Sequence, residues 1–253
     1  MVGRMDEIGK RAFMFGIYKI DLYAILAILA TIANLLAGTI ICVTILFFNP
    51  LDPITTARLI SLGAGFDALD GKLARRSNTP NRFGSKLDTA ADQITFATAP
   101  ALIIWHLLID TSEIFGIICG LIYFFTASFR LSRYVMAPTY GYFEGMPSPV
   151  SAYFIVGWLL QDDLIVPIFG FSTIFISLLM ISSFPYSGFR TLRSKFQYFY
   201  FIFTISLMLL TNFAPNSLFG LIGDVWIYYV YYFGIIGPFH ALHNIKIDKS
   251  QLG

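Results

Sequence analysis

The sequence predicts an all-α, polytopic membrane protein, and three observations support this fold class. Of the 253 residues, 57% are hydrophobic and only 13% are charged, whereas ordinary globular domains are roughly 45–50% apolar and about 25% charged. Long apolar runs recur along the whole chain. Helices and closed barrels are the two structures that satisfy the backbone within lipid, and the alternating segments of a membrane barrel are not evident in the sequence.

The apolar runs predict about eight transmembrane helices within residues 22–239. A helix needs about 20 apolar residues to cross the hydrocarbon core, and the run over residues 22–47 is long enough to cross at a tilt. The remaining predicted spans cover residues 54–73, 84–109, 114–136, 149–161, 164–182, 196–212 and 217–239. The span over residues 149–161 is the weakest of these, because it is short for a crossing.

The two ends of the chain are polar. Residues 1–20 interleave basic and apolar side chains, which predicts an amphipathic helix in the membrane interface; a frayed terminus is the alternative. Residues 240–253 form a polar tail. Because the sequence contains no long linker, we expect residues 1–253 to form a single domain. Cys42 and Cys119 lie in apolar runs and are expected to be buried thiols without a disulfide or metal role.

The positions of the basic residues predict the orientation. If both termini face the cytoplasm, all of the 17 Lys and Arg residues except Arg58 fall on the inner side or near inner span ends. The turns at Asp52, Asp110 and residues 162–163 are acidic and fall outside. This distribution follows the positive-inside rule. It places the acidic motif described next on the cytoplasmic side.

Four aspartates lie at the adjoining ends of two neighbouring predicted spans. Asp67 and Asp70 share one helix face, as do Asp88 and Asp92 on the next helix, and the short connection allows the two faces to meet. Four desolvated carboxylates repel one another, and divalent cations relieve this repulsion. Oxygen ligands suit Mg²⁺ or Mn²⁺, and four carboxylates can hold two ions. Asp92, deepest in its helix, is the candidate general base.

Small and basic residues accompany these acids. Gly71, Ala74 and Gly84 leave room for a ligand to approach the helix backbone, and the guanidinium of Arg75 fits a phosphate. Together with the metal site, they indicate a pyrophosphate-bearing substrate. The alternative is structural charge pairing of the aspartates with Lys72 and Arg75.

This pattern is similar to a known family signature. Written D-x2-DG-x2-AR-x8-G-x3-D-x3-D, it resembles that of the CDP-alcohol phosphotransferases at every fixed position. The resemblance implies a two-metal centre on the four aspartates, with Asp92 as general base. It also implies attack of an acceptor hydroxyl on the β-phosphorus of a CDP-linked lipid, release of CMP, and a homodimer. The residues implied to bind the nucleotide are Asp67, Gly71, Ala74, Arg75 and Gly84.

Further stretches resemble the phosphatidylserine synthase or archaetidylserine synthase branch of that family. They are FRLSRY at residues 129–134, FEGMPSP at residues 143–149 and SSFPYSGFR at residues 182–190. The resemblance implies CDP-diacylglycerol or CDP-archaeol as donor and L-serine as acceptor. The first span also looks like that branch, which makes Asn34 a candidate nucleotide contact; packing of the face formed by residues 31, 34 and 38 is the alternative.

The acceptor contacts are less specific. Arg130 and Arg133 are candidates to bind the serine carboxylate, or else they reach toward the interface. Glu144 is a candidate for the ammonium, or else it is solvated, and residues 190 and 193 are candidates for lipid headgroups. Glycerol phosphate or an inositol phosphate is the alternative acceptor, and a divalent-cation transporter or a structural membrane protein with an inactive site is the alternative class. No nucleic-acid partner is expected.

Overall fold

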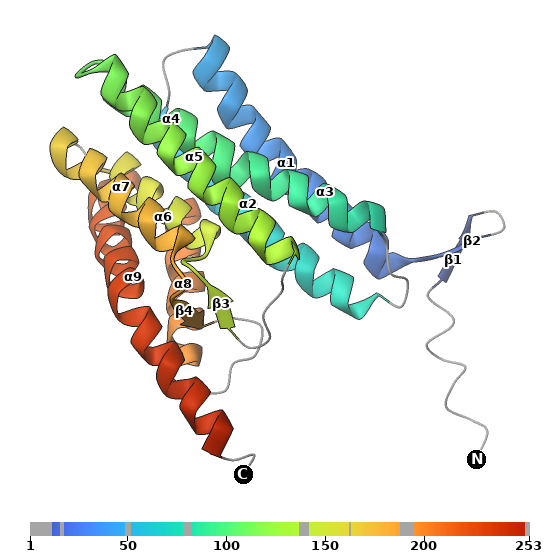
Figure 1. The fold of residues 1–253 in the computed structure, drawn as a ribbon. Helices are drawn as coiled ribbons and strands as arrows, with labels where there is room; N and C mark the ends of the chain where they lie inside the picture. The colour runs from blue at the N-terminus through green and yellow to red at the C-terminus, as the bar shows by residue number, and fades with distance from the viewer. Residues whose placement is uncertain are drawn as a thin grey trace, which may run out of the picture.

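The computed structural model describes residues 12–15, 18–48, 52–77, 82–136, 142–161, 163–187 and 195–250 (Figure 1). It is mostly helical, as predicted. The α-helices are α1 (Leu22–Phe47), α2 (Pro53–Arg76), α3 (Arg82–Gln93), α4 (Ala99–Ile109), α5 (Glu113–Met136), α6 (Ser148–Leu159), α7 (Val166–Ile181), α8 (Lys195–Phe213) and α9 (Phe219–Ser250). A π-helical segment, η2 (Ile94–Thr98), joins α3 to α4, and a short 3-10 helix, η3 (Asn216–Leu218), precedes α9.

Four helical segments are long and apolar enough to cross a membrane by length and composition. They are Leu22–Phe47, Arg82–Ile109, Glu113–Met136 and Asn216–Leu242. The other predicted spans are also helical, but α2 carries the charged motif, and α6, α7 and the apolar part of α8 are shorter. At 1.5 Å per residue, the 12 residues of α6 rise only about 18 Å, less than the roughly 30 Å of a hydrocarbon core.

One prediction at the chain ends is wrong for the residues that the structure describes. Ala12–Phe15 (β1) and Tyr18–Asp21 (β2) form an antiparallel hairpin in place of an interfacial helix. These segments are rich in aromatic and β-branched residues, which favour strands; residues 1–11 lie outside the described part. At the other end, α9 passes the predicted limit at residue 239 and continues to Ser250, so the polar tail begins as helix.

The core surrounds α6. Every residue from Val150 to Leu160 is buried, because a helix that is apolar on all sides needs packing partners all round. Helices α2, α7 and α9 pack against α6, while α1 packs on α2 and α5 packs on α4 and α7. One cluster of buried apolar side chains extends from Ile41 in α1 to Phe233 in α9.

Figure 1 shows that several chain segments lie toward the lower end of the bundle. They are the start of α1, the end of α2, the start of α3, and a second small sheet. In that sheet Tyr142–Glu144 (β3) pairs antiparallel with Pro185–Ser187 (β4), with Phe143 opposite Tyr186. This end therefore gathers the ends of α2 and α3 that carry the acidic motif and the small sheet formed by described parts of residues 143–149 and 182–190.

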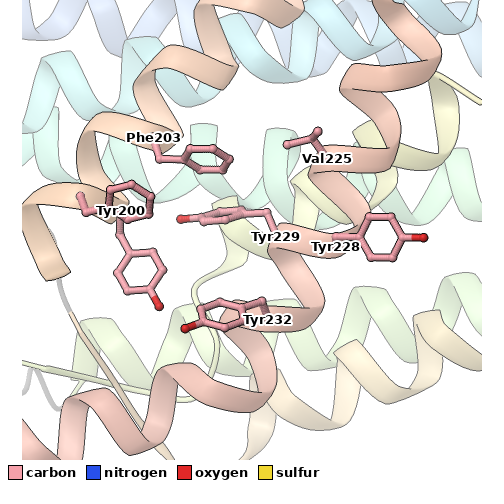
Figure 2. Close-up of a pocket in the computed structure, with 7 residues that line it drawn as sticks. Tyr200, Phe203, Val225, Tyr228, Tyr229 and Tyr232 are labelled. Carbon is pink, nitrogen blue, oxygen red and sulfur yellow. The ribbon is translucent and has the colours of Figure 1, made fainter.

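An aromatic groove lies elsewhere, between α8 and α9 (Figure 2). Its volume is about 400 Å³, and the hydroxyl of Tyr229 at its wall is paired with that of Thr204 at 2.7 Å. Among the described residues, the lining contains no charged residue and no residue of the acidic motif; it consists of Phe199, Tyr200, Phe203, Val225, Tyr228, Tyr229 and Tyr232.

Candidate active site

The last turns of α2 carry the first acid pair. Asp67 and Asp70 lie one helical turn apart, so both carboxylates emerge on the same side of the helix. Asp70 is only 4% exposed, whereas Asp67 is half-buried. Arg75 and Arg76 end the helix, where positive charge is favourable beside the helix dipole.

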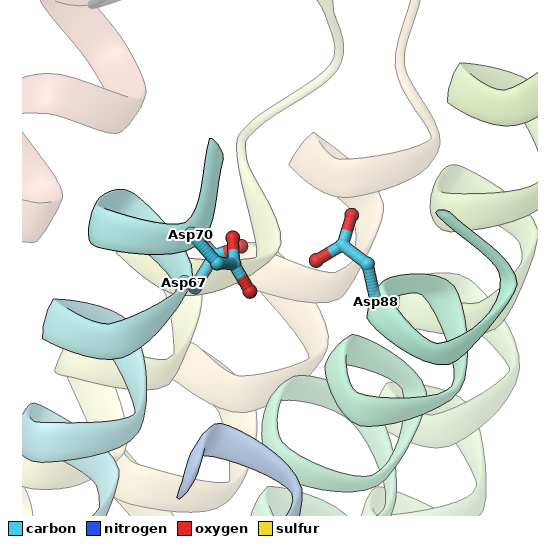
Figure 3. A group of neighbouring side chains, drawn as sticks. All are labelled: Asp67, Asp70 and Asp88. Atoms are coloured by element: carbon cyan, nitrogen blue, oxygen red, sulfur yellow. The ribbon is translucent and has the colours of Figure 1, made fainter. Parts of the chain in front are cut away.

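The second acid pair lies on α3 and meets the first. Asp67, Asp70 and Asp88 each offer a carboxylate oxygen, and these three atoms lie within 4.8 Å of one another (Figure 3). Asp92, one turn beyond Asp88, is within hydrogen-bonding reach of Asp67 and interacts electrostatically with Asp70 and Asp88. The two acid faces therefore meet, as the helical spacing predicts.

Helix α1 supports one member of each acid pair. The Thr31 hydroxyl lies 2.6 Å from Asp70 Oδ2 and donates to it, and Asn34 Nδ2 donates to Asp92 Oδ1 at 3.2 Å. Both α1 side chains are buried. The backbone carbonyl of Asn34 accepts a hydrogen bond from the Thr95 hydroxyl at 2.9 Å. These bonds link α1 and α2 to the continuous helix formed by α3, η2 and α4 (Arg82–Ile109), directly behind the carboxylates.

Two glycines allow this close contact. A Cβ at Gly38 of α1 would lie 2.4 Å from Thr95 Oγ1 and 2.8 Å from Thr95 Cα. A Cβ at Gly63 of α2 would lie 2.8 Å from Thr95 Cγ2 and 3.0 Å from Asn34 Oδ1. Because only hydrogen fits at both positions, the approach of the three helices depends on them.

The π-helical segment determines where Thr95 meets α1. Pro100 has no N–H and cannot donate to the carbonyl four residues before it. Ala99 N–H instead donates to the Ile94 carbonyl, five residues back, which is the π-helical pattern. This wide turn contains Thr95 and lies less than one turn beyond Asp92, so it belongs to the support of the acid cluster.

The acid cluster fits a divalent cation. Carboxylates this close in a partly buried site repel one another unless a positive charge lies between them. The gathered ligand atoms are all carboxylate oxygens, and oxygen donors are those preferred by Mg²⁺, Mn²⁺ and Ca²⁺.

The predicted nucleotide residues lie around the same end of the bundle. The Arg75 guanidinium folds back along α2, with Nη1 3.3 Å from the position that a Cβ at Gly71 would occupy. Ala74 and Arg75 are exposed, and Gly71 and Gly84 are half-buried. These four residues are thus accessible, in contrast to Asn34, which is fully buried.

Arg130 of α5 is the buried cation of this region. Only 6% of it is exposed, and it interacts electrostatically with Asp92 and Asp67. Nη1 donates to Ser148 Oγ at 2.8 Å, and the guanidinium carbon lies 5.8 Å from the centre of the Phe143 ring. Nε is buried without a hydrogen-bond partner among the described residues. A guanidinium with a buried, unused donor beside an acid cluster is suited to bind an anionic group.

Arg133 has different surroundings. Its guanidinium donates to the backbone carbonyls of Glu144, Ile181 and Ser182 at 2.5–3.3 Å. Glu144 is half-buried in β3, and this bond uses its backbone oxygen. Arg130 and Arg133, which the sequence pattern gives the same candidate role, therefore have different hydrogen-bond acceptors in the structure. Residues 190 and 193, the predicted lipid contacts, lie outside the described residues.

Several supporting residues had no distinct signal in the sequence. Ser148 follows Pro147 at the start of α6 and accepts from Arg130. Gln93 Nε2 donates to Ser128 Oγ at 2.6 Å and joins α3 to α5. Thr95 lies in an apolar run, and a single polar residue there does not indicate which helix it contacts.

Comparison with known proteins identifies the architecture. Residues 24–233 match the family model of the CDP-alcohol phosphatidyltransferases. The chain is 33% identical over 153 residues to a CDP-diacylglycerol–serine O-phosphatidyltransferase of Methanocaldococcus jannaschii, covering 60% of this chain and 70% of that protein. It is 30% identical over 165 residues to the Bacillus subtilis protein of that name, covering 63% and 88%. It is 34% identical over 131 residues to an archaetidylserine synthase of Methanothermobacter thermautotrophicus, covering 51% and 56%.

The family model spans the acidic motif, its support on α1 and the buried arginine of α5. The chain is therefore a membrane enzyme that belongs to the CDP-alcohol phosphatidyltransferase family.

Proposed function

We propose that this enzyme transfers a phosphatidyl-type group from a CDP-lipid to L-serine and releases CMP. The observation that carries the proposal is the meeting of two acid pairs beside the buried guanidinium of Arg130. The names of the relatives support serine as acceptor, and they include both a diacylglycerol and an archaeol type of lipid.

We propose that Asp67, Asp70, Asp88 and Asp92 hold two divalent cations, Mg²⁺ or Mn²⁺. The close approach of three carboxylates supports this assignment. When bound, the cations neutralise the acids and stabilise negative charge on the pyrophosphate. The protein's own contribution is to hold the ligands in place, through Thr31 on Asp70 and Asn34 on Asp92.

The nucleotide site follows the same end of α2 and α3. We assign the CMP part of the donor to Asp67 and to the accessible residues Gly71, Ala74, Arg75 and Gly84. Arg75 supplies a fork for phosphate oxygens, and the glycines allow backbone approach. Asn34 is fully buried and bonded to Asp92, so any contact it makes with the nucleotide requires the Asn34 side chain to become accessible.

The reaction needs one proton acceptor. The serine hydroxyl oxygen forms a bond to the β-phosphorus, the bond from that phosphorus to the bridging oxygen breaks, and CMP leaves with the bond electrons. The hydroxyl proton passes to a carboxylate, for which Asp92 is the candidate. Its hydrogen bond from Asn34 and its proximity to Asp67 keep its side chain in the cluster.

The acceptor carboxylate is assigned to Arg130, whose Nε is buried without a partner among the described residues. Glu144 is the candidate for the serine ammonium. An acceptor phosphate, as in glycerol phosphate or an inositol phosphate, would require more basic residues around Arg130; of the described basic side chains, Arg133 is already engaged by three backbone carbonyls.

The test is an acceptor screen with purified enzyme. Incubation with CDP-diacylglycerol or CDP-archaeol, Mg²⁺ or Mn²⁺, and each acceptor in turn is expected to release CMP with L-serine, with the product lipid identified by mass. Asp92→Asn should abolish release, whereas Asp163→Asn, the same change at an exposed site, should not. Release with glycerol phosphate or an inositol phosphate and none with serine would refute the serine assignment.

We further propose that residues 1–253 act as one domain with eight spans, as a homodimer among membrane lipids, and with the active site facing the cytoplasm. In a variant without Cys42 and Cys119, a cysteine at exposed Ser85 should react with an impermeant reagent only from the cytoplasmic side. A cysteine at exposed Thr111, in the opposite turn, should react only from outside. The reverse pattern would overturn the orientation, and a monomeric mass in detergent would contradict the dimer.

A further inference from the structure

Arg133 joins two loop segments that are distant in sequence. From the last turn of α5, its Nη2 donates to the Glu144 carbonyl at 2.5 Å and to the Ser182 carbonyl at 3.0 Å. Its Nη1 donates to the Ile181 carbonyl at 3.3 Å. The first acceptor ends β3, and the other two lie where α7 leads into β4. One planar guanidinium thus ties the end of α5 to β3 and to the segment where α7 leads into β4.

The backbone around this guanidinium is closely packed. Gly145 N–H donates to the Phe184 carbonyl at 2.9 Å, and Met146 N–H donates to the Leu179 carbonyl at 3.0 Å. Gly145 has a φ of 76°, a conformation that side chains other than glycine rarely adopt. A Cβ there would lie 2.1 Å from the Met180 carbonyl oxygen and 2.6 Å from Arg133 Nη2.

The far side of the sheet is attached to α9. The Tyr186 hydroxyl donates to the Gly234 carbonyl at 2.9 Å, and the Tyr186 ring stacks on Phe233 with the ring centres 5.5 Å apart. Since Tyr186 is fully buried, these contacts anchor β4 to α9. Arg133 completes the attachment of β3 and β4 from the side of α5.

The segment held in this way contacts Arg130 twice. Phe143 in β3 places its ring 5.8 Å from the Arg130 guanidinium, and Ser148, four residues after Glu144, accepts from Arg130 Nη1 at 2.8 Å. Both contacts depend on the path of the chain through Gly145 and Met146. Arg130 and Arg133 therefore contact the same segment, Arg130 at Phe143 and Ser148 and Arg133 at the Glu144 carbonyl.

We propose that Arg133 is a positioning residue for the acceptor site. It fixes the β3–β4 sheet, and through Phe143 and Ser148 that sheet holds the Arg130 guanidinium in its place beside the acid cluster. Arg133 does not itself bind the acceptor. The role requires arginine, because its fork reaches three carbonyls at once, whereas a lysine ammonium is a compact charge that lacks the fork geometry. This inference rests on the proposed transfer to serine.

The first experiment does not depend on the reaction. Hydrogen–deuterium exchange of substrate-free protein is measured on peptides that contain the amides of Gly145 and Met146. Arg133→Lys should speed exchange of these amides about tenfold, on the order of one lost hydrogen bond. Arg58→Lys is the same change in α2, where the guanidinium lies over the Phe219 ring of α9, and it should leave these amides unchanged. Unchanged exchange in Arg133→Lys would overturn the proposed positioning role of Arg133.

The second experiment measures the kinetic consequence. Arg133→Lys should raise the KM for serine about tenfold and leave the KM for CDP-lipid within about twofold. Gly145→Ala should reproduce this change, and the double variant should be no worse than the more affected single one. A raised serine KM with wild-type exchange would instead make Arg133 a direct ligand. If the wild type releases no CMP with serine, the proposed function fails while the exchange result still stands.

Discussion

Substitution of Gly38 by alanine is the sharpest test of the contact between α1 and the acid cluster. The added Cβ would lie 2.4 Å from Thr95 Oγ1, 2.8 Å from Thr95 Cα and 2.9 Å from Thr95 N. Two of these three atoms belong to the backbone of the π-helical segment and cannot rotate away. The methyl group must therefore push α1 away from the continuous α3–η2–α4 helix.

The size of the effect follows from these distances. Ordinary van der Waals contact begins at 3.4 Å, so relief of the closest contact requires a shift of about 1 Å. Overpacking of this kind costs about 1–3 kcal/mol of stability. The shift also weakens the Thr95 bond to Asn34 and the 3.2 Å bond from Asn34 to Asp92. Since a displacement of about 1 Å can cost 10²-fold in rate, we expect kcat to fall about 100-fold.

Gly65→Ala is the matched control. A Cβ at Gly65, also on a helix of this bundle, would have Met208 Cε at 3.6 Å as its nearest neighbour, which is an ordinary contact. Alanine there should keep the rate and raise stability by up to about 1 kcal/mol through helix propensity. Thermal unfolding in detergent and CMP release measure both effects. If Gly38→Ala unfolds and reacts like Gly65→Ala, then α1 does not support Asp92 in the way described.

Three other predictions follow from the site. Manganese binding to substrate-free enzyme, followed by electron paramagnetic resonance, should be lost in Asp88→Asn, and a chelator should abolish CMP release until Mg²⁺ or Mn²⁺ is restored; binding that survives the substitution would contradict the ligand assignment. Arg130→Lys should raise the KM for serine at least tenfold, because lysine cannot reproduce the guanidinium contacts; an unchanged serine KM in initial-rate assays would exclude Arg130 from the acceptor site. Pro100→Ala should lower kcat at least tenfold with little loss of thermal stability, because restored α-helical bonding re-aims the segment before it; a wild-type kcat would show that Asp92 does not depend on the π-turn.

The helices and the meeting of the acids could be predicted because both depend on local spacing. A run of apolar residues such as 22–47 predicts a helix wherever its neighbours lie, and the observed α1 has the same limits. The offset between Asp67 and Asp70, repeated with one residue more between Asp88 and Asp92, aims two pairs of side chains at one another once the helices are neighbours. Figure 3 shows the result for three of the four.

The remaining features depend on contacts between distant residues. Arg133 was expected to act with Arg130 because the two are three residues apart, but its hydrogen-bond acceptors lie as far as 49 residues away. The central, buried position of α6 could not be predicted either, because a short apolar helix has the same sequence pattern whether lipid or protein surrounds it. At the amino terminus, the strand preference of the aromatic residues in β1 and β2 outweighed the interleaved charges on which the predicted interfacial helix rested.

The position of Arg130 explains how the protein keeps both charge types buried in one place. An isolated guanidinium in an apolar core is costly, and so is a group of carboxylates without a cation. Here each lies in the field of the other, since Arg130 interacts with Asp92 and Asp67, yet each is held by its own support. Asn34 and Thr31 hold the acids from α1, while Ser148 and Phe143 hold Arg130 from the β3–β4 side. Because the supports are separate, weakening α1 should lower kcat, whereas loosening the sheet should raise the KM for serine. The same defect from both substitutions would mean that the two halves of the site move as one unit.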